Sequence, residues 1–311
     1  MPQGEIRVTL ARPDKRELPP APEGAYSERA GLGASVLVGL IGAGIQESRT
    51  PHMHEAEGAR LGLRYIYKLL DIEPIGLGPE ALPDLVRAAE LTGFVGLNVT
   101  HPFKQSILPL LDELSSEAAA IGAVNTVVFQ HGRRIGHNTD CWGFAESFRR
   151  QMAGSPVRSV VQIGAGGAGT AVARALMDVG VESLIIHDAN GDRALTLASA
   201  LSREYGAGRA TAVSSPATAL AHADGLVNAT PMGMAKYPGL PVDANLLRPA
   251  LWVADIVYFP LETELLRAAR KLGSRTLSGA GMALFQAVKA FELFSGIRPD
   301  ADAMRRHFEA D

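Results

Sequence analysis

The chain has 311 residues, of which 47% are hydrophobic, 20% charged and 6% aromatic, and its formal net charge is −3. This length predicts about two domains, and the apolar fraction is large enough for sizeable cores, which excludes general disorder. A slightly acidic chain provides no basic field for phosphates, so no nucleic-acid partner is expected. The single cysteine, Cys141, cannot form an internal disulfide, and a cytoplasmic location is expected.

Residues 1–34 contain five prolines and equal numbers of acidic and basic side chains. They have no apolar core of a signal peptide, and their acids argue against a transit peptide. We expect an extended or disordered leader, or a segment that packs on a neighbour. The longest apolar run, residues 34–45, is shorter than the roughly 18 residues of a membrane span, so no membrane association is expected.

From residue 35, short β-rich runs alternate with amphipathic helical stretches. Thr50 and Pro51 are expected as the N-cap and first residue of the first helix. The order β-α-β-α-β predicts a mostly parallel sheet, followed by a hairpin. The predicted elements are a strand at 35–41, a helix at 50–62, a strand at 64–69, a helix at 80–92, a strand at 94–99, and hairpin strands at 125–129 and 133–137.

A second series of strands and helices begins at residue 158. Its first strand leads directly into the glycine-rich segment GAGGAG and then into a helix that ends near Val179. The sequence therefore predicts two α/β domains, with terminal helices that pack back on the first. The further predicted elements are strands at 158–163, 183–187, 210–213, 225–228 and 251–254, and helices at 279–294 and 299–308.

Three segments contain the pattern G-x-G, but only one completes the dinucleotide-binding fingerprint. The pair at 42–44 lacks the third glycine, and the pair at 279–281 lacks it too and follows no clear strand. In the complete pattern, the first glycine permits a tight turn, the second admits a pyrophosphate and the third allows close helix–strand packing, while the helix start favours phosphates. The predicted cofactor loop comprises Gly164, Ala165, Gly166, Gly167, Ala168 and Gly169.

Asp188 predicts the choice of cofactor. It lies 19 residues after Gly169, at the end of the next strand, where a carboxylate accepts hydrogen bonds from the ribose hydroxyls and repels a 2′-phosphate. No basic residue follows before Arg193. We therefore expect NAD in preference to NADP.

Polar clusters at the ends of elements in the first half of the chain are candidates for chemistry. A nicotinamide enzyme that oxidises an alcohol needs a group that takes the hydroxyl proton and groups that anchor the substrate. The clusters are Ser48-Arg49-Thr50-Pro51, the segment from Asn98 to Lys104, Asn125-Thr126, and Asn138-Thr139-Asp140.

The chain resembles the shikimate/quinate dehydrogenase family over roughly residues 35–308. The motifs that carry the resemblance are SRTPHMHE, NVTHPFKQ, GAVNTVV, GHNTDCWGF, GAGGAG, NATPMGM, VYFPLETELL and GAGMALFQAVKAFELF. The resemblance implies a substrate-binding domain from residues 35–142 and 279–311, a Rossmann-type NAD-binding domain from residues 143–278, and a site in the cleft between them.

The resemblance also implies roles for individual residues. Lys104 and Asp140 become the catalytic pair, because a partly desolvated lysine beside a carboxylate can exchange a proton with the hydroxyl that is oxidised. Which of the two takes the proton first stays open. Ser48 and Thr50 resemble the hydroxyls that hold the substrate carboxylate. Four residues match positions that bind the ring hydroxyls or the carboxylate, namely Thr100, Asn125, Tyr258 and Gln286. Four match the loop near the nicotinamide, namely Asn228, Thr230, Met232 and Gly233.

Two departures from the common biosynthetic pattern resemble the quinate-accepting, NAD-dependent branch. Thr50 stands where many members have a second serine, and Asp188 stands where they bind a 2′-phosphate. The expected function is NAD-dependent oxidation of the C3 hydroxyl of shikimate, quinate or both by a monomer or homodimer, in a biosynthetic or a catabolic role. The alternatives are aminoshikimate or another carboxylated cyclitol as substrate, and a non-catalytic NAD-binding regulator, against which the intact Lys104 and Asp140 argue.

Other conspicuous residues are not assigned chemistry. His52 and His54 are two positions apart on a helix and face different directions, so no metal site is expected and we interpret both as surface or helix-start polarity. Cys141 is expected to pack in the interior. Phe285, Phe291 and Phe294 recur at helical spacing and are predicted core residues.

Overall fold

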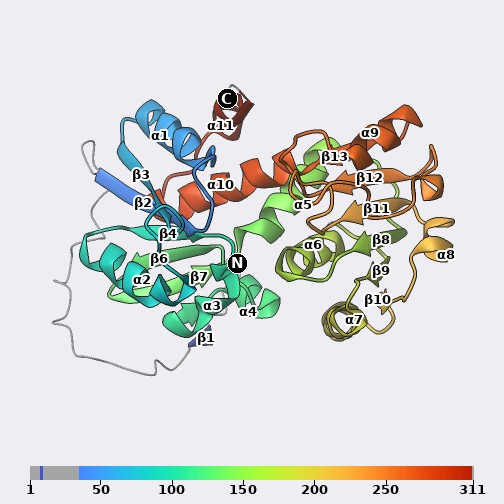
Figure 1. Ribbon diagram of the computed structural model, residues 1–311, viewed down its shortest axis with the longest axis horizontal. Coiled ribbons are helices and arrows are strands. Elements are labelled where there is room, and N and C mark those ends of the chain that lie inside the picture. The colour runs from blue at the N-terminus through green and yellow to red at the C-terminus, as the bar shows by residue number, and fades with distance from the viewer. Residues whose placement is uncertain (1–7, 10–34, 310–311) are drawn as a thin grey trace, which may run out of the picture. The chain divides into compact units, whose positions relative to one another are not determined.

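The computed structural model describes residues 8–9 and 35–309 (Figure 1). The chain forms two compact units. The first contains the described residues up to Thr139 and those from Ala287 onward, and the second runs from Asp140 to Gln286. Of the predicted leader, only strand β1 (Val8–Thr9) is described, and the rest lies outside the described residues. In the described ranges, no helix has both the length and the apolarity to cross a membrane.

The first unit contains a seven-stranded, mixed sheet with the order β1-β5-β7-β6-β4-β2-β3. Strand β2 pairs in parallel with β3 and β4, and β6 and β7 form the predicted hairpin. This arrangement confirms the predicted α/β class and the strands that the alternating pattern indicated. The further strands of this sheet are β2 (Ser35–Gly42), β3 (Arg64–Asp71), β4 (Gly96–Val99), β5 (Glu113–Leu114), β6 (Thr126–Gln130) and β7 (Arg133–His137).

Helices from both ends of the chain pack in the first unit. The ring of Phe291 stacks on that of Tyr65, with centroids 4.9 Å apart and planes 10° apart, so α10 contributes directly to the core beside β3. Phe294 takes the space that a side chain at Gly96 would need. The helices of this unit are α1 (Thr50–Arg60), α2 (Leu82–Leu91), α3 (Phe103–Ser106), α4 (Ser116–Ile121), α11 (Ala301–Glu309), the last part of α10 (Gly279–Ser295), and the short 3-10 helices at Pro79–Ala81 and Leu108–Leu110.

The second unit has a six-stranded, wholly parallel sheet with the order β10-β9-β8-β11-β12-β13. This is the doubly wound dinucleotide-binding order, which reverses direction between β8 and β11 and places ligands at the carboxyl ends of those strands. Its strands are β8 (Ser159–Ile163), β9 (Ser183–His187), β10 (Ala210–Ala212), β11 (Gly225–Asn228), β12 (Trp252–Asp255) and β13 (Thr276–Ser278). Its helices are α5 (Thr139–Gln151, whose first residue belongs to the first unit), α6 (Gly167–Asp178), α7 (Gly191–Tyr205), α8 (Ala217–Leu220), α9 (Glu264–Lys271), the first part of α10, and a 3-10 helix at Ala244–Leu246.

The glycine pair at 279–281 follows a strand that the sequence did not indicate. Strand β13 is short and leads straight into α10, whose first residues are these glycines. A Cβ at Gly279 would lie 2.2 Å from the carbonyl oxygen of Ile256, and one at Gly281 would lie 2.0 Å from Oγ of Ser147. Close packing therefore accounts for the G-x-G pattern at 279–281.

Candidate functional site

The two candidate anchor hydroxyls lie at the start of α1. The helix begins at Thr50, and its N-cap position is Arg49, which makes no side-chain capping bond. The backbone N–H of Thr50 donates to Oγ of Ser48 at 3.4 Å. The expectation that Thr50 is the N-cap is therefore wrong, because Thr50 is already helical and Ser48 provides the oxygen. Both hydroxyls remain at a helix N-terminus, where anions are favoured.

Thr100 and Lys104 follow the carboxyl end of β4. The N–H of Thr100 donates to the carbonyl of Ile41 at the end of the adjacent β2 (3.0 Å), and the carbonyl of Lys104 accepts from the N–H of Val124 (2.8 Å). Lys104 is half-buried in α3, which the fully buried Phe103 fixes to the core. These bonds bring the loops that carry Ser48, Thr100, Lys104 and Asn125 to one end of the sheet.

Asn125 holds the start of α5. Its Oδ1 accepts the backbone N–H of Thr139 at 2.8 Å, and its Nδ2 donates to Oγ1 of Thr139 at 3.0 Å, with both residues buried. Asp140 is the next residue, in the first turn of α5, where the helix dipole favours an acid. Lys104 lies in the first unit, and Asp140 is the first residue of the second unit.

Behind Asn125 lies a buried polar network that joins two of the candidate polar segments, and its member Tyr67 is a residue that sequence reasoning missed. Asn98, next to last in β4, accepts a hydrogen bond from the Tyr67 hydroxyl (Oδ1···Oη 2.7 Å) and donates to Oγ1 of Thr126 (3.0 Å). The Thr126 hydroxyl in turn donates to Oδ1 of Asn125 (3.1 Å). Burial raises the pKa of Tyr67, so its hydroxyl keeps its proton and can donate. An asparagine inside an apolar strand was the available signal.

The glycines of the predicted cofactor loop have the three environments that the fingerprint requires. Gly164 has φ of +103°, in the region that favours glycine, and a Cβ there would lie 2.6 Å from the carbonyl oxygen of Ala229. A Cβ on Gly169 would lie 2.4 Å from the carbonyl of Gly164. Gly166 has no protein atom within 4 Å of its Cβ position, and it precedes α6 without a side-chain cap. The loop thus has open space in front of the helix N-terminus and fits a pyrophosphate group.

Asp188 contacts this loop directly. Its Oδ2 accepts the N–H of Ala165 at 2.7 Å, and its Oδ1 accepts the N–H of Asn190 at 2.8 Å. A carboxylate has about four acceptor positions, so two of them still suit the paired hydroxyls of a ribose. The side chain therefore fits the predicted adenosine-ribose contact and also fixes the glycine turn.

The loop after β11 is organised by Asn228, which is fully buried. Its Oδ1 accepts from Oγ1 (2.7 Å) and N (3.1 Å) of Thr230, and its Nδ2 donates to the carbonyl of Met232 (2.9 Å). The loop then turns at Gly233, whose φ is +101°. Asn228 thus shapes the loop that presents Thr230, Met232 and Gly233 beside the reversal point of the sheet.

Asp255, at the end of β12, is a second residue that sequence reasoning missed. Its carboxylate accepts from Nδ2 of Asn228 (2.9 Å), Oγ1 of Thr263 (2.7 Å) and N of Val257 (3.0 Å). Burial raises the pKa of Asp255, and these hydrogen bonds offset part of the increase. Tyr258, three residues after Asp255, is 53% exposed. The signal in the sequence was an acidic residue at the end of an apolar strand.

Gln286 is the last residue of the second unit, on α10. Its Nε2 donates to the carbonyl of Ala283 at 3.0 Å. Its backbone lies against α5, because a Cβ on Gly143 would be 2.7 Å from the nitrogen of Gln286. Tyr258 and Gln286 therefore belong to the second unit, while Ser48, Thr50, Thr100 and Asn125 belong to the first.

The expectation of surface or helix-start polarity is wrong for His54. Its side chain is fully buried against Tyr65, Tyr67, Phe291 and Phe294, and its Nδ1 lies 3.1 Å from the Tyr65 hydroxyl. Desolvation lowers its pKa to about 3, so the ring is neutral. The chain places it there because α1 packs between β3 and α10.

Of the remaining residues that were set aside, His52 is exposed at the start of α1, as expected, and the others are buried. His52 contacts the ring of His307, with centroids 5.7 Å apart. Cys141 is buried with Sγ 3.9 Å from Oδ2 of Asp178, and the phenylalanines predicted for the core are buried. Among residues 8–9 and 35–309, no group of three or more His, Cys, Asp or Glu side chains is arranged to hold a metal ion.

The doubly wound parallel sheet and its glycine turn define a Rossmann-type nicotinamide-binding fold, joined in one chain to a second α/β unit. The substrate-binding domain model of shikimate dehydrogenase matches residues 40–127, and the C-terminal domain model of shikimate 5'-dehydrogenase matches residues 279–307. The chain belongs to the shikimate dehydrogenase family.

Relatives within this family differ in their named cofactor. A shikimate dehydrogenase (NADP(+)) of Streptomyces avermitilis is 57% identical over 273 residues, which cover 87% of this chain and 94% of that protein. A quinate/shikimate dehydrogenase (NAD(+)) of Corynebacterium efficiens is 49% identical, covering 88% of this chain and 98% of the relative. The solved quinate dehydrogenase of Corynebacterium glutamicum in complex with NAD has a TM-score of 0.83 at 47% identity, covering 89% of this chain and 99% of its own.

Proposed function

We propose that the protein is an NAD-dependent dehydrogenase that interconverts shikimate and 3-dehydroshikimate, quinate and 3-dehydroquinate, or both. The observation that carries the proposal is the gathering of Thr100, Lys104 and Asn125 at the end of the sheet where Ser48 and Thr50 open α1. A proton-exchanging lysine, hydroxyl-binding side chains and a helix start that favours a carboxylate are the groups that a carboxylated cyclic alcohol requires.

In this proposal the two units have different tasks. The predicted substrate-binding domain, residues 35–142 and 279–311, takes in the first unit together with residues 140–142 and 279–286 of the second, and the remaining residues of the second unit, 143–278, bind the cofactor. The loop from Gly164 to Gly169 and Asp188 would hold NAD, which would accept the hydride. Asn228 would shape the loop of Thr230, Met232 and Gly233 beside it. Tyr258 and Gln286 complete the contacts to the substrate.

Lys104 and Asp140 accept and return the hydroxyl proton in the proposed reaction. As the C3 carbon loses hydride, its hydroxyl loses a proton to this pair, which returns it to solvent or to the ketone in the reverse direction. Thr100 and Asn125 orient the ring by hydrogen bonds to its hydroxyls. The bonds from Asn125 to Thr139 support this role, because they fix the helix turn that carries Asp140.

Asp188 supports the choice of NAD over NADP. Overall identity does not decide between the cofactors, because the 57% identical relative is named for NADP and the 49% identical relative for NAD. The local chemistry at the end of β9 supports NAD, since a carboxylate repels a 2′-phosphate. The sequence His187-Asp188-Ala189-Asn190 contains no arginine or lysine that would compensate.

The test is a set of four assays that pair shikimate or quinate with NAD or NADP and follow reduced cofactor by absorbance. The proposal expects turnover of at least one acid, with a higher kcat/KM for NAD than for NADP. A higher kcat/KM with NADP would overturn the cofactor assignment alone. Turnover only of an amino-substituted or other carboxylated cyclitol would replace the substrate, and NAD binding without turnover of any of these would favour a regulator.

A further inference from the structure

The first glycine pair, at 42–44, binds a carboxylate of the protein itself. Asp71 is the last residue of β3 and is 5% exposed. Its Oδ1 accepts the N–H of Gly44 at 3.0 Å, and its Oδ2 accepts the N–H of Ile45 at 2.9 Å and Nε2 of Gln46 at 2.9 Å. The N–H of Glu73 adds a fourth bond at 3.2 Å. Three of these four donors belong to the loop between β2 and α1.

The backbone of this loop has the form of an anion-binding concavity. Gly44 has φ of +65°, and this left-handed turn directs its N–H and that of Ile45 toward the two oxygens of one carboxylate. On the other side, a Cβ at Gly42 would lie 2.4 Å from Cγ2 of Thr100, and the N–H of Ala43 donates to the carbonyl of His101. The loop is therefore held between Asp71 and the turn that carries Thr100.

The carboxylate of Asp71 is suited to this task because it stays ionised. Its partial desolvation raises the pKa, but the hydrogen bonds from Gln46, Ile45, Glu73 and Gly44 outweigh that effect, and the pKa lies below its usual value. Hydrogen bonds to a charged acceptor are stronger than neutral ones. Three of the four bonds that Asp71 accepts come from the loop, so they fix the loop to the end of β3.

We propose that Asp71 is a positioning residue that fixes the anchor loop, residues 42–50, and thereby sets Ser48 and Thr50 for the carboxylate of the substrate. The link is short, since the N–H of Ser48 donates to the carbonyl of Ile45 at 3.0 Å. A loop that is ordered before binding pays less conformational entropy when the substrate arrives. The proposal rests on the proposed function, in which these hydroxyls hold that carboxylate.

The first test substitutes Asp71→Asn in the full-length protein and uses Asp84→Asn as a charge-matched control on the exposed face of α2. We expect KM for the acid substrate to rise about tenfold, as for the loss of roughly one charge-assisted bond, with KM for NAD unchanged and a smaller effect on kcat. Equal losses in both KM values and kcat would overturn the positioning role.

The second test asks whether Asp71 acts through Ser48. In a double-mutant cycle, the variant that combines Asp71→Asn with Ser48→Ala should have a kcat/KM only slightly below that of the more damaging single variant. Both substitutions would remove the same interaction, that of the Ser48 hydroxyl with the substrate carboxylate. Fully additive costs would overturn the proposal.

If Asp71→Asn does not fold, Gln46→Ala removes one of the four donors more gently and should raise KM for the acid about twofold to threefold. An unchanged KM in Gln46→Ala would then be the contrary result.

Hydrogen exchange separates this proposal from the proposed function. The amides of Gly44 and Ile45 should exchange faster in Asp71→Asn than in the wild type and be unchanged in Asp84→Asn, whatever the enzyme turns over. Unaltered exchange would overturn the role of Asp71 even in an active enzyme. A wild-type protein without turnover of shikimate or quinate would contradict the proposed function alone.

Discussion

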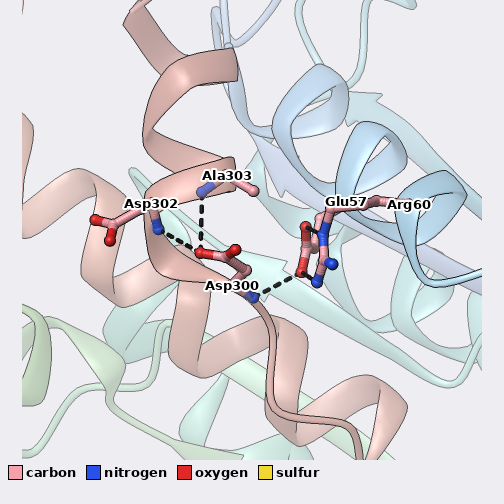
Figure 2. A network of polar contacts seen from close by, with 5 residues as sticks. All are labelled: Glu57, Arg60, Asp300, Asp302 and Ala303. Carbon is pink, nitrogen blue, oxygen red and sulfur yellow. Dashed lines mark hydrogen bonds and ion pairs between the residues drawn. The ribbon is translucent and has the colours of Figure 1, made fainter.

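Glu57 on α1 accepts a hydrogen bond from the backbone N–H of Asp300, with Oε1 2.7 Å from the nitrogen (Figure 2). The same carboxylate is paired with Arg60 one turn later on α1, with Nε 2.7 Å from Oε2. Oδ1 of Asp300 in turn accepts the N–H groups of Asp302 and Ala303. One buried carboxylate thus joins α1, at whose start the proposed anchor hydroxyls lie, to the start of α11.

Replacing Glu57 should destabilise the first unit. Glu57→Ala removes a buried acceptor from Asp300 and leaves a gap, so we expect the free energy of unfolding to fall by about 2–4 kcal/mol. Urea denaturation followed by circular dichroism measures the change. Glu117→Ala, at an exposed position of α4, is the control and should cost less than about 0.5 kcal/mol. Equal stability of the two variants would contradict the prediction.

Replacing Lys104 should remove turnover without removing binding. Lys104→Ala takes away one member of the proposed proton-exchanging pair, so kcat should fall by about 10²- to 10⁴-fold while KM for NAD stays close to that of the wild type. Steady-state kinetics test this, with Lys68→Ala on the exposed side of β3 as the matched loss of charge. Near-normal turnover of Lys104→Ala would refute its catalytic role.

Adding a methyl group at Gly166 should weaken cofactor binding in a folded protein. The Cβ would meet no protein atom within 4 Å, so the Tm should not change, but it would occupy the space before α6 where a pyrophosphate approaches. We expect Kd for NAD, measured by calorimetry, to rise at least about tenfold. The control is Gly191→Ala, which also adds a methyl group in open space and should bind NAD normally. Gly180→Ala is unsuitable because φ at Gly180 is +98°. Unchanged affinity in Gly166→Ala would remove the loop from the cofactor site.

Removing the charge of Asp188 should shift cofactor preference. Asp188→Asn retains an oxygen that can accept the N–H of Ala165 but no longer repels a 2′-phosphate, so the ratio of kcat/KM for NADP to that for NAD should rise by about tenfold or more. Asp192→Asn, four residues later at an exposed position, should leave the ratio unchanged. The assignment fails if both variants retain the wild-type ratio.

The buried His54 should make the first unit sensitive to acid. Its pKa is about 3 in the folded protein, against an ordinary value of 6.5, so the unfolded chain binds a proton first as the pH falls. Stability should therefore decrease below about pH 6.5, with a contribution that approaches 1.4 kcal/mol per pH unit until the folded pKa is reached.

The measurement compares urea denaturation at several pH values between 7 and 4. His54→Phe keeps an aromatic ring among Tyr65, Tyr67 and Phe291 but cannot be protonated, so its stability should depend less on pH than that of the wild type. His222→Asn, at an exposed position of the second unit, should behave as the wild type. Parallel pH profiles for His54→Phe and the wild type would contradict the assignment.

The features that the sequence predicts well are those encoded over short distances. The alternation of apolar strands and helices identifies β2, α1, β3 and β4 to within a few residues, and glycine spacing identifies the turn after β8 because each glycine meets a local steric demand. Likewise, the carboxyl ends of parallel strands are the places where candidate side chains gather.

The features that escaped prediction depend on partners that are distant in the sequence. Phe291 and Phe294, on the last long helix, help to bury His54, and Asp71 accepts the N–H of Gly44, 27 residues earlier in the chain. Thr50 is a local exception: it is helical and not the N-cap, and Ser48, two residues earlier, accepts its N–H. No periodicity in the sequence reports such contacts.

The stacking of Phe291 on Tyr65 has a consequence for biosynthesis. A ribosome that has made residues 35–139 has still not made the ring that covers Tyr65 and His54, because that ring belongs to the last 25 residues of the chain. The continuous second unit, by contrast, is fully synthesised before Ala287 appears. During translation the doubly wound unit can therefore close first, while the face of the N-terminal sheet around Tyr65 stays uncovered until the C-terminal helices emerge.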